Sequence, residues 1–362
     1  MTAEATPNDF VHDLVAVVPA GGVGSRLWPL SQPTRPKFLI DLLDTGATLI
    51  QDTVARLAPL TADVVVVTGE RHADAVAAQL PQVGREAIIA EPSPRDSMAA
   101  IALAAAVIEA RHGERIMASF AADHVIPDAG PFRDAVRTAV EAARTGKVVT
   151  IGITPDSPSS AFGYIKAGAA LAEAPGAFAV EAFTEKPDEE TAAAMLAEGG
   201  YSWNAGMFVV STSVLLAHLS RLQPTLATGV REIAAAWDRP ERDHVLARVW
   251  PTLTKIAIDH AIAEPVAAEG GVAMVPGDFS WHDVGDFDSL ASLLKAGDDG
   301  AIRIGRTSPV SLVDADGAVV VGGTKPLAVV GISDAVVVET DEAILVTRRP
   351  AAQRVKDVAL PQ

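Results

Sequence analysis

A short apolar run that opens into a glycine-rich loop constrains the fold of this chain more than any other feature. Residues Leu14–Val18 are apolar enough for a buried strand, and the loop Ala20-Gly21-Gly22-Val23-Gly24-Ser25 follows almost at once. Glycines lack a Cβ, so the backbone N–H groups of such a loop can turn outward and close on a ligand. Two cations, Arg26 and Lys37, come next. This combination predicts a polyphosphate site at the carboxyl end of a buried strand.

The two best-known phosphate loops do not match this stretch. A dinucleotide-binding fingerprint needs a third glycine, whereas Gly22-Val23-Gly24 is followed by Ser25-Arg26-Leu27. A Walker loop needs Ser or Thr after its Gly-Lys pair, and Gly146-Lys147 is followed by Val148. Taken alone, the run is either another kind of phosphate loop or a plain glycine turn between a strand and a helix.

Apolar runs alternate with helical patterns from residue 15 to about residue 153. The candidate strands are 15–19, 64–68, 87–90, 117–121 and 148–152, and the candidate helices are 49–57, 73–80, 98–111 and 132–144. Such alternation predicts a mostly parallel α/β sheet with helices on both faces. In open sheets of this kind ligands bind at the carboxyl ends of the strands, where both the glycine loop and Asp123 fall.

The pattern changes in the rest of the chain. Shorter strands are expected at 162–167, 178–184 and 206–210, followed by helices over 212–219, 225–237 and 241–249. After the polar break at 297–300, short strands are expected near 311–313, 318–321, 327–330, 335–339 and 343–347. We therefore predict two domains, residues 1–296 and residues 297–362, of which the second is a small β-rich domain.

Composition excludes several classes of function. The formal net charge is −17, which argues against nucleic acid or an anionic membrane surface as a partner. The 362 residues include no cysteine, so disulfides and thiolate chemistry are excluded. Residues 1–13 lack the pattern of a signal peptide, and no apolar run approaches the roughly 18 residues of a membrane span. We expect a cytoplasmic protein.

The loop resembles the G-G-x-G-x-R-L-x-P-L…P-K signature of the sugar-phosphate nucleotidylyltransferases, and Trp28 is typical of the mannose-1-phosphate guanylyltransferase branch. Further blocks follow in the family's order over roughly residues 15–294: Ala122-Asp123-His124, Phe162-Gly163-Tyr164, Phe183-Thr184-Glu185-Lys186-Pro187, Trp203-Asn204-Ala205-Gly206-Met207-Phe208 and Trp281-His282-Asp283-Val284-Gly285. The resemblance implies a Rossmann-like, GT-A-like nucleotidyltransferase domain with a mostly parallel mixed sheet. It also implies a β-helix-like C-terminal domain that contributes to a homodimer.

The activity that the resemblance implies is the transfer of GMP from GTP to mannose 1-phosphate, which yields diphosphate and GDP-mannose, a precursor of cell-wall glycans. The sugar phosphate attacks the α-phosphorus directly, so catalysis consists of positioning and charge neutralisation. Arg26 and Lys37 would hold the triphosphate and the leaving diphosphate, and Asp123 and Asp283 would bind Mg²⁺. The nucleotide-binding residues implied are Ala20, Gly21, Gly22, Gly24, Ser25, Arg26, Arg95, Ser97 and Asp123.

The remaining blocks imply a sugar site. Lys186 would orient the attacking phosphate and completes the set of catalytic residues with Arg26, Lys37, Asp123 and Asp283. Glu185 would accept bonds from sugar hydroxyls, and Asn204 could both donate to and accept from a hydroxyl pair. The sugar-binding residues implied are Gly163, Tyr164, Glu185, Lys186, Asn204 and Gly206.

One segment departs from the family. Its usual pattern, E-P-x-x-R-N-T-A-P-A, reads Glu91-Pro92-Ser93-Pro94-Arg95-Asp96-Ser97-Met98-Ala99-Ala100 here. We expect Asp96 or Ser97 to cap the helix that follows, and Asp259 to have a structural role. Because this segment lies where relatives contact the base, the same reaction with another base or sugar stays open, and so does a non-catalytic nucleotide-sugar-binding regulatory subunit.

Overall fold

The computed structural model describes residues 10–305 and 307–358. The signal-peptide prediction rests largely on residues 1–9, which lie outside the described part. Contacts divide the chain into two compact units, one of residues 1–21, 54–121 and 126–281, the other of residues 22–53, 122–125 and 282–362. The second unit thus includes two segments from the N-terminal half. The domain boundary predicted between residues 296 and 297 stays a prediction.

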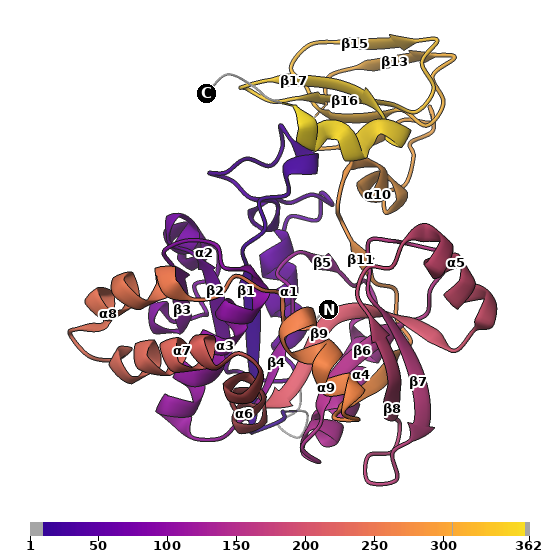
Figure 1. Cartoon of the computed structure of the whole chain (residues 1–362). Helices are drawn as coiled ribbons and strands as arrows, with labels where there is room; N and C mark the ends of the chain where they lie inside the picture. Colours follow the sequence, from indigo (N-terminus) through magenta and orange to yellow (C-terminus); the bar gives the residue numbers. More distant parts are fainter. Residues whose placement is uncertain (1–9, 306, 359–362) are drawn as a thin grey trace. The chain divides into compact units, whose positions relative to one another are not determined.

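Within the described residues, the first unit holds a nine-stranded sheet in the order β3-β2-β1-β4-β9-β6-β10-β8-β7 (Figure 1). Its strands are β1 (Leu14–Ala20), β2 (Val64–Gly69), β3 (Ile88–Glu91), β4 (Ile116–Ser119), β6 (Val148–Ile153), β7 (Tyr164–Ala170), β8 (Phe178–Thr184), β9 (Tyr201–Ser211) and β10 (Val272–Gly277). Parallel pairing joins β3, β2, β1 and β4, and also β6 and β10, whereas β7, β8 and β9 pair antiparallel. The sheet is therefore mixed.

The helices of this region are α1 (Leu49–Leu57), α2 (Ala73–Gln79), α3 (Asp96–His112), α4 (Ala129–Ala143), α5 (Glu189–Glu198), α6 (Thr212–Leu222), α7 (Pro224–Ala236), α8 (Arg242–Val249) and α9 (Glu264–Ala268). A helix lies in each region where one was predicted, and α5 and α9 are additional. Every residue of α3 from Met98 to Ile108 is buried, because the helix packs against β1 and β2 and also against α6 and α7. A helix that is apolar all round fits such a position.

Strand β10 was not predicted. It pairs parallel with β6 and antiparallel with β8, so it lies in the interior of the sheet. Its sequence, Val272-Ala273-Met274-Val275-Pro276-Gly277, ends in two residues that are typical of turns. The sheet context therefore outweighs the local turn signal.

The second unit is built around short strands. A two-residue bridge pairs β5 (His124–Val125) with β11 (His282–Asp283) and is followed by α10 (Phe287–Ser292). The side chain of Asp286 caps α10 and forms a capping box with Ser289. Helix α10 packs in an apolar cluster that includes Leu27 and Val284.

The C-terminal strands form a coil of regular register. A four-stranded sheet has the order β12 (Ile302–Ile304), β14 (Val319–Gly322), β16 (Ala335–Glu339) and β17 (Ile344–Arg348), and β13 (Val310–Val313) pairs with β15 (Leu327–Val330). Ile302 pairs with Val319, and Val319 with Val336, both in parallel and at the same offset along the chain. The chain returns to the same register at each step, which is how a β-helix stacks its coils.

Candidate active site

The ammonium of Lys37 joins the two carboxylates that were predicted to bind metal. Its Nζ lies 3.0 Å from Asp123 Oδ2 and 3.2 Å from Asp283 Oδ1, and it donates to the carbonyl of Val284 at 3.0 Å. All three ammonium protons therefore have acceptors within the second unit. A triphosphate oxygen could bind Lys37 only by replacing one of them.

Strand pairing explains why residues 123 and 283, far apart in the sequence, meet. In the β5–β11 bridge Asp283 lies opposite His124, so Asp123 is adjacent to the bridge. The sequence spacing alone could not predict this pairing. The structure thus brings Lys37, Asp123 and Asp283 into one cluster.

The glycine loop is shaped to let Lys37 approach. Gly24 has φ +78°, and a Cβ at this position would lie 2.9 Å from the Cβ of Lys37. The backbone N–H of Lys37 donates to the carbonyl of Val23 at 3.2 Å. Gly22 is exposed and borders the Asp123 carboxylate, since a Cβ there would lie 3.9 Å from Oδ2. Gly24 is therefore needed for close packing, while Gly21 and Gly22 are exposed.

Lys37 and Asp283 each favour the ionised form of the other. Burial works to lower the pKa of Lys37, but the negative charges of Asp123 and Asp283 outweigh it and raise that pKa above its ordinary value. Burial alone would raise the pKa of Asp283, yet Lys37, His124 and Arg26 together lower it. Both groups are therefore charged at neutral pH, and Arg26 belongs to the electrostatic surroundings of the cluster.

The donor set fits a magnesium ion only together with a substrate. Among the described residues, no group of three or more His, Cys, Asp or Glu side chains could hold a metal. Mg²⁺ is commonly bound by one or two carboxylates and completed by substrate phosphates and water. Asp123 and Asp283, which converge on one positive charge, provide such a pair.

The residues predicted to bind the sugar also lie together, in the first unit. Asn204 Oδ1 accepts from Thr150 Oγ1 at 2.8 Å and from the backbone N–H of Gly206 at 3.1 Å. Its Nδ2 donates to Asp259 Oδ1 at 2.8 Å. Tyr164 is fully buried, and its hydroxyl accepts from the backbone N–H of Ser159 at 2.9 Å. Much of the polar capacity of Asn204 and Tyr164 is thus used within the protein.

Glu185 and Lys186 close this cluster at the end of β8. Lys186 Nζ lies 3.1 Å from Glu185 Oε1, and its side chain is 62% exposed while that of Glu185 is 8% exposed. Gly163 leaves room for the Glu185 carboxylate, because a Cβ there would lie 2.4 Å from Oε2. Lys186 has φ +46°, a conformation that strains a residue with a side chain and persists mainly where function requires it.

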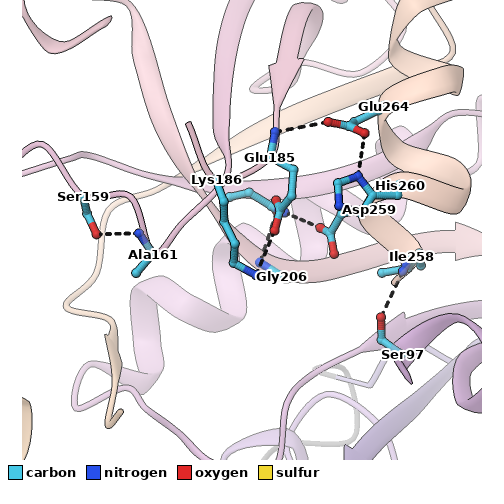
Figure 2. A network of polar contacts seen from close by, with 11 residues as sticks. Ser97, Ser159, Ala161, Glu185, Lys186, Gly206, Ile258, Asp259, His260 and Glu264 are labelled. Atoms are coloured by element: carbon cyan, nitrogen blue, oxygen red, sulfur yellow. Dashed lines mark hydrogen bonds and ion pairs between the residues drawn. The ribbon is translucent and has the colours of Figure 1, made fainter. Parts of the chain in front are cut away.

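Asp259 is the residue whose importance the sequence did not reveal. Figure 2 shows it in the same polar network as Glu185, where Glu264 accepts from the backbone N–H of Glu185 at 3.2 Å and contacts His260 Nδ1 at 2.8 Å. Burial and the nearby Glu185 carboxylate raise the pKa of Asp259 to about 6. Asp259 opens a π-helical turn, a local irregularity that is frequent at functional sites. That turn leaves no clear mark in the sequence.

The segment predicted to contact the base is tied to residues 250–258. Arg95 donates to the carbonyls of Pro251 at 2.6 Å and Leu253 at 3.1 Å. The predicted helix cap is wrong, because α3 begins at Asp96 with no side-chain cap. The Ser97 hydroxyl instead accepts from the backbone N–H of Ile258 at 2.9 Å.

Two family models match the chain. A nucleotidyl transferase model matches residues 15–298, and a mannose-phosphate isomerase/GMP-like β-helix model matches residues 309–359. These matches confirm the predicted fold class, a Rossmann-like nucleotidyltransferase with a mixed sheet and a β-helix-like C-terminal domain.

Known proteins resemble the chain over most of its length. It is 38% identical to the xanthan biosynthesis protein XanB of Xanthomonas campestris pv. campestris (strain B100), over 96% of this chain and 73% of that protein. It is 39% identical to a mannose-1-phosphate guanylyltransferase of Escherichia coli (strain K12), over 76% of this chain and 59% of that protein. A crystal structure named "mannose-1-phosphate geranyltransferase" from Thermus thermophilus superimposes with a TM-score of 0.83 at 29% identity, over 95% of this chain and 98% of that one. The chain therefore belongs to the nucleotidyl transferase family.

Proposed function

We propose that the chain is a mannose-1-phosphate guanylyltransferase, which transfers GMP from GTP to α-D-mannose 1-phosphate and releases diphosphate and GDP-mannose. The observation that carries the proposal is the Lys37–Asp123–Asp283 cluster, with contacts of 3.0 and 3.2 Å, in a member of the nucleotidyl transferase family. A subunit that only senses a nucleotide sugar has no need for two carboxylates that converge on one cation. The guanylyltransferase name of relatives at 34–39% identity supports guanine and mannose as the substrates.

The role proposed for each residue follows from its charge. The exposed glycines Gly21 and Gly22 would supply backbone amides to the triphosphate, and Arg26 would supply a positive charge. Lys37 keeps both carboxylates in place. Lys186, exposed and beside Glu185, holds the phosphate of the sugar so that its oxygen can attack the α-phosphorus. The new P–O bond forms as the bond to the departing diphosphate breaks, and no covalent enzyme intermediate is needed.

We assign the binding of Mg²⁺ to Asp123 and Asp283. When bound, the ion would neutralise charge on the phosphates around the reacting phosphorus. The chain itself contributes the carboxylate oxygens and an ammonium that prevents their mutual repulsion.

A homodimer through the C-terminal strands is part of the proposal. Strand β17 is an edge strand of its sheet, and its apolar side chains Ile344 and Val346 are 65% and 64% exposed. An unpaired apolar edge is typical of a surface that a second strand or subunit covers. Light scattering after size-exclusion chromatography should give the mass of two chains, and of one chain for Val346→Glu.

The substrates indicate where in the cell the reaction takes place. The reaction consumes GTP, so we propose that it takes place in the cytoplasm. None of the helices in the described ranges is long and apolar enough to cross a bilayer.

Incubation with GTP, mannose 1-phosphate and Mg²⁺ should yield GDP-mannose and diphosphate in equal amounts. Binding of GDP-mannose without any turnover would instead support a regulatory subunit.

A further inference from the structure

The polar network of the first unit contains three carboxylates (Figure 2). Glu264 is bonded to the backbone N–H of Glu185 and to His260, whereas Glu185 and Asp259 have few donors around them. Glu185 Oε1 has the ion pair with Lys186. Asp259 Oδ1 accepts from Asn204, and in the described part of the chain no other side chain donates to Asp259. Asp259 is half-buried, and in the described part of the chain neither carboxylate has a buried oxygen without a partner, so their remaining acceptor capacity is accessible to a ligand. The pKa of Asp259 is raised by its burial and by the nearby Glu185 carboxylate.

The orientation of Asp259 is fixed through Asn204. Because the Asn204 carbonyl oxygen accepts from Thr150 and from Gly206, its amide cannot flip without losing both bonds. Nδ2 therefore faces Asp259. The acceptor capacity that we expected Asn204 to offer a hexose is used within the protein. The carboxylate of Asp259, next to the Asn204 amide, can accept hydrogen bonds from a hexose instead.

The chemistry of this network selects its ligand. The carboxylates of Glu185 and Asp259 would repel an anionic group but accept hydrogen bonds from an uncharged group that is rich in donors. A set of sugar hydroxyls has this character, whereas the phosphate of the same molecule would be drawn to the exposed Lys186. The charges thus direct the hydroxyl end of a sugar phosphate toward Glu185 and Asp259, and its phosphate toward Lys186.

We propose that Asp259 is a second acceptor for a sugar hydroxyl, beside Glu185, and that it helps to determine which sugar 1-phosphate the enzyme uses. The inference rests on the proposed function, of which it deepens the sugar specificity. Asn204 is then a positioning residue, which holds the Asp259 carboxylate in one orientation.

The test compares Asp259→Asn with wild type and with Asp243→Asn, a matched control whose carboxylate is 82% exposed on α8. Initial rates of diphosphate release are measured for mannose 1-phosphate and for its 2-, 3-, 4- and 6-deoxy analogues. Titration calorimetry of mannose 1-phosphate with the full chain provides a second readout.

For Asp259→Asn we expect the KM for mannose 1-phosphate and its calorimetric Kd to rise about tenfold or more, because a bond to a charged acceptor is lost. The KM for GTP should change less than about twofold. With one deoxy analogue, the one that lacks the bonded hydroxyl, wild type and Asp259→Asn should perform alike, and Asp243→Asn should match wild type throughout.

Three results would overturn the assignment. They are an unchanged KM for mannose 1-phosphate in Asp259→Asn, an equal additional loss with every analogue, or an equal rise in the KM for GTP. The last two would mean that Asp259 only supports the local structure. If wild type makes no GDP-mannose at all, the proposed function fails, which is a distinct outcome from failure of the Asp259 assignment.

Discussion

The Nζ atom of Lys37 lies 3.0 Å from Oδ2 of Asp123, an ion pair between a residue that follows the glycine loop and a residue that directly precedes β5. Asp283 joins the same ammonium at 3.2 Å, and the carbonyl of Val284 accepts from it at 3.0 Å. One cation therefore ties together three segments of the second unit that are far apart in the sequence. The cluster couples the loop that follows β1 to the residues proposed to bind metal.

Replacing Asp123 tests the metal assignment. Asp123→Ala should lower the rate of diphosphate release by about a hundredfold or more, because the charge that stabilises the transition state is lost. The fold should persist, since Lys37 keeps Asp283 and the Val284 carbonyl as partners. Asp134→Asn, whose carboxylate is 79% exposed, is the control. Wild-type turnover in a folded Asp123→Ala variant would contradict the assignment.

Gly24 should be intolerant of a side chain. Gly24→Ala places a Cβ 2.9 Å from the Lys37 Cβ at a residue with φ +78°, so we expect a loss of about 1–3 kcal/mol in the free energy of unfolding. Gly130→Ala is the matched control, because a Cβ there meets nothing within 4 Å. Urea unfolding of both variants measures the difference. Equal stabilities would show that the loop does not depend on this close approach.

Gly163→Ala should separate function from stability. Its Cβ would lie 2.4 Å from Glu185 Oε2, and a flexible carboxylate can move away at little cost in folding free energy. The moved carboxylate would no longer match the sugar hydroxyls. We expect a melting temperature close to that of wild type and a KM for mannose 1-phosphate raised about tenfold. An unchanged KM would remove Glu185 from the sugar site.

Lys186 should act on the sugar phosphate alone. Lys186→Ala removes an ammonium that is 62% exposed, so the KM for mannose 1-phosphate should rise by about tenfold or more while the KM for GTP stays within about twofold. Steady-state rates at varied concentrations of each substrate measure both values. An unchanged response to the sugar phosphate would refute the role.

The ionisation of Asp259 should make the protein less stable as pH rises. Its pKa is raised from 3.8 to about 6 in the folded state, so the folded state binds more protons than the unfolded state between these values. Stability contributed by the protonated form is present below about pH 4 and is lost as pH rises through about 6. Asp259→Asn should therefore be more stable than wild type at pH 7.5 by about 1–2 kcal/mol, and of similar stability at pH 4. Urea unfolding at the two pH values measures this, and a difference that does not depend on pH would contradict the raised pKa.

Much of the fold could be predicted because local patterns and tertiary structure agree. Helix α1 and strand β8 begin and end at the residues expected, and the regions of β1, β2 and β6 extend the predicted ranges by one or two residues. Strand β10 was missed because Pro276 and Gly277 carry a turn signal, while the pairing that makes it a strand comes from β6 and β8.

Site residues could be predicted where they belong to a sequence motif. Their hydrogen-bond partners could not be predicted, because tertiary packing determines them. The Glu185-Lys186 pair and the two aspartates at 123 and 283 could be named from the sequence. Two hydrogen bonds depend on contacts between segments that are distant in the chain. The Asn204 amide donates to Asp259, and the Ser97 hydroxyl accepts from the backbone N–H of Ile258 instead of capping α3. Single-sequence patterns contain no information on such contacts.

One measurement determines the identity of the two substrates. Diphosphate release is followed for each of GTP, ATP, UTP and dTTP with each of mannose, glucose, N-acetylglucosamine and manno-heptose 1-phosphates, at fixed enzyme and Mg²⁺. GTP with mannose 1-phosphate should have the highest kcat/KM, by about a hundredfold or more over other pairs. A higher kcat/KM for any other pair, or no release from any pair, would contradict the proposed function.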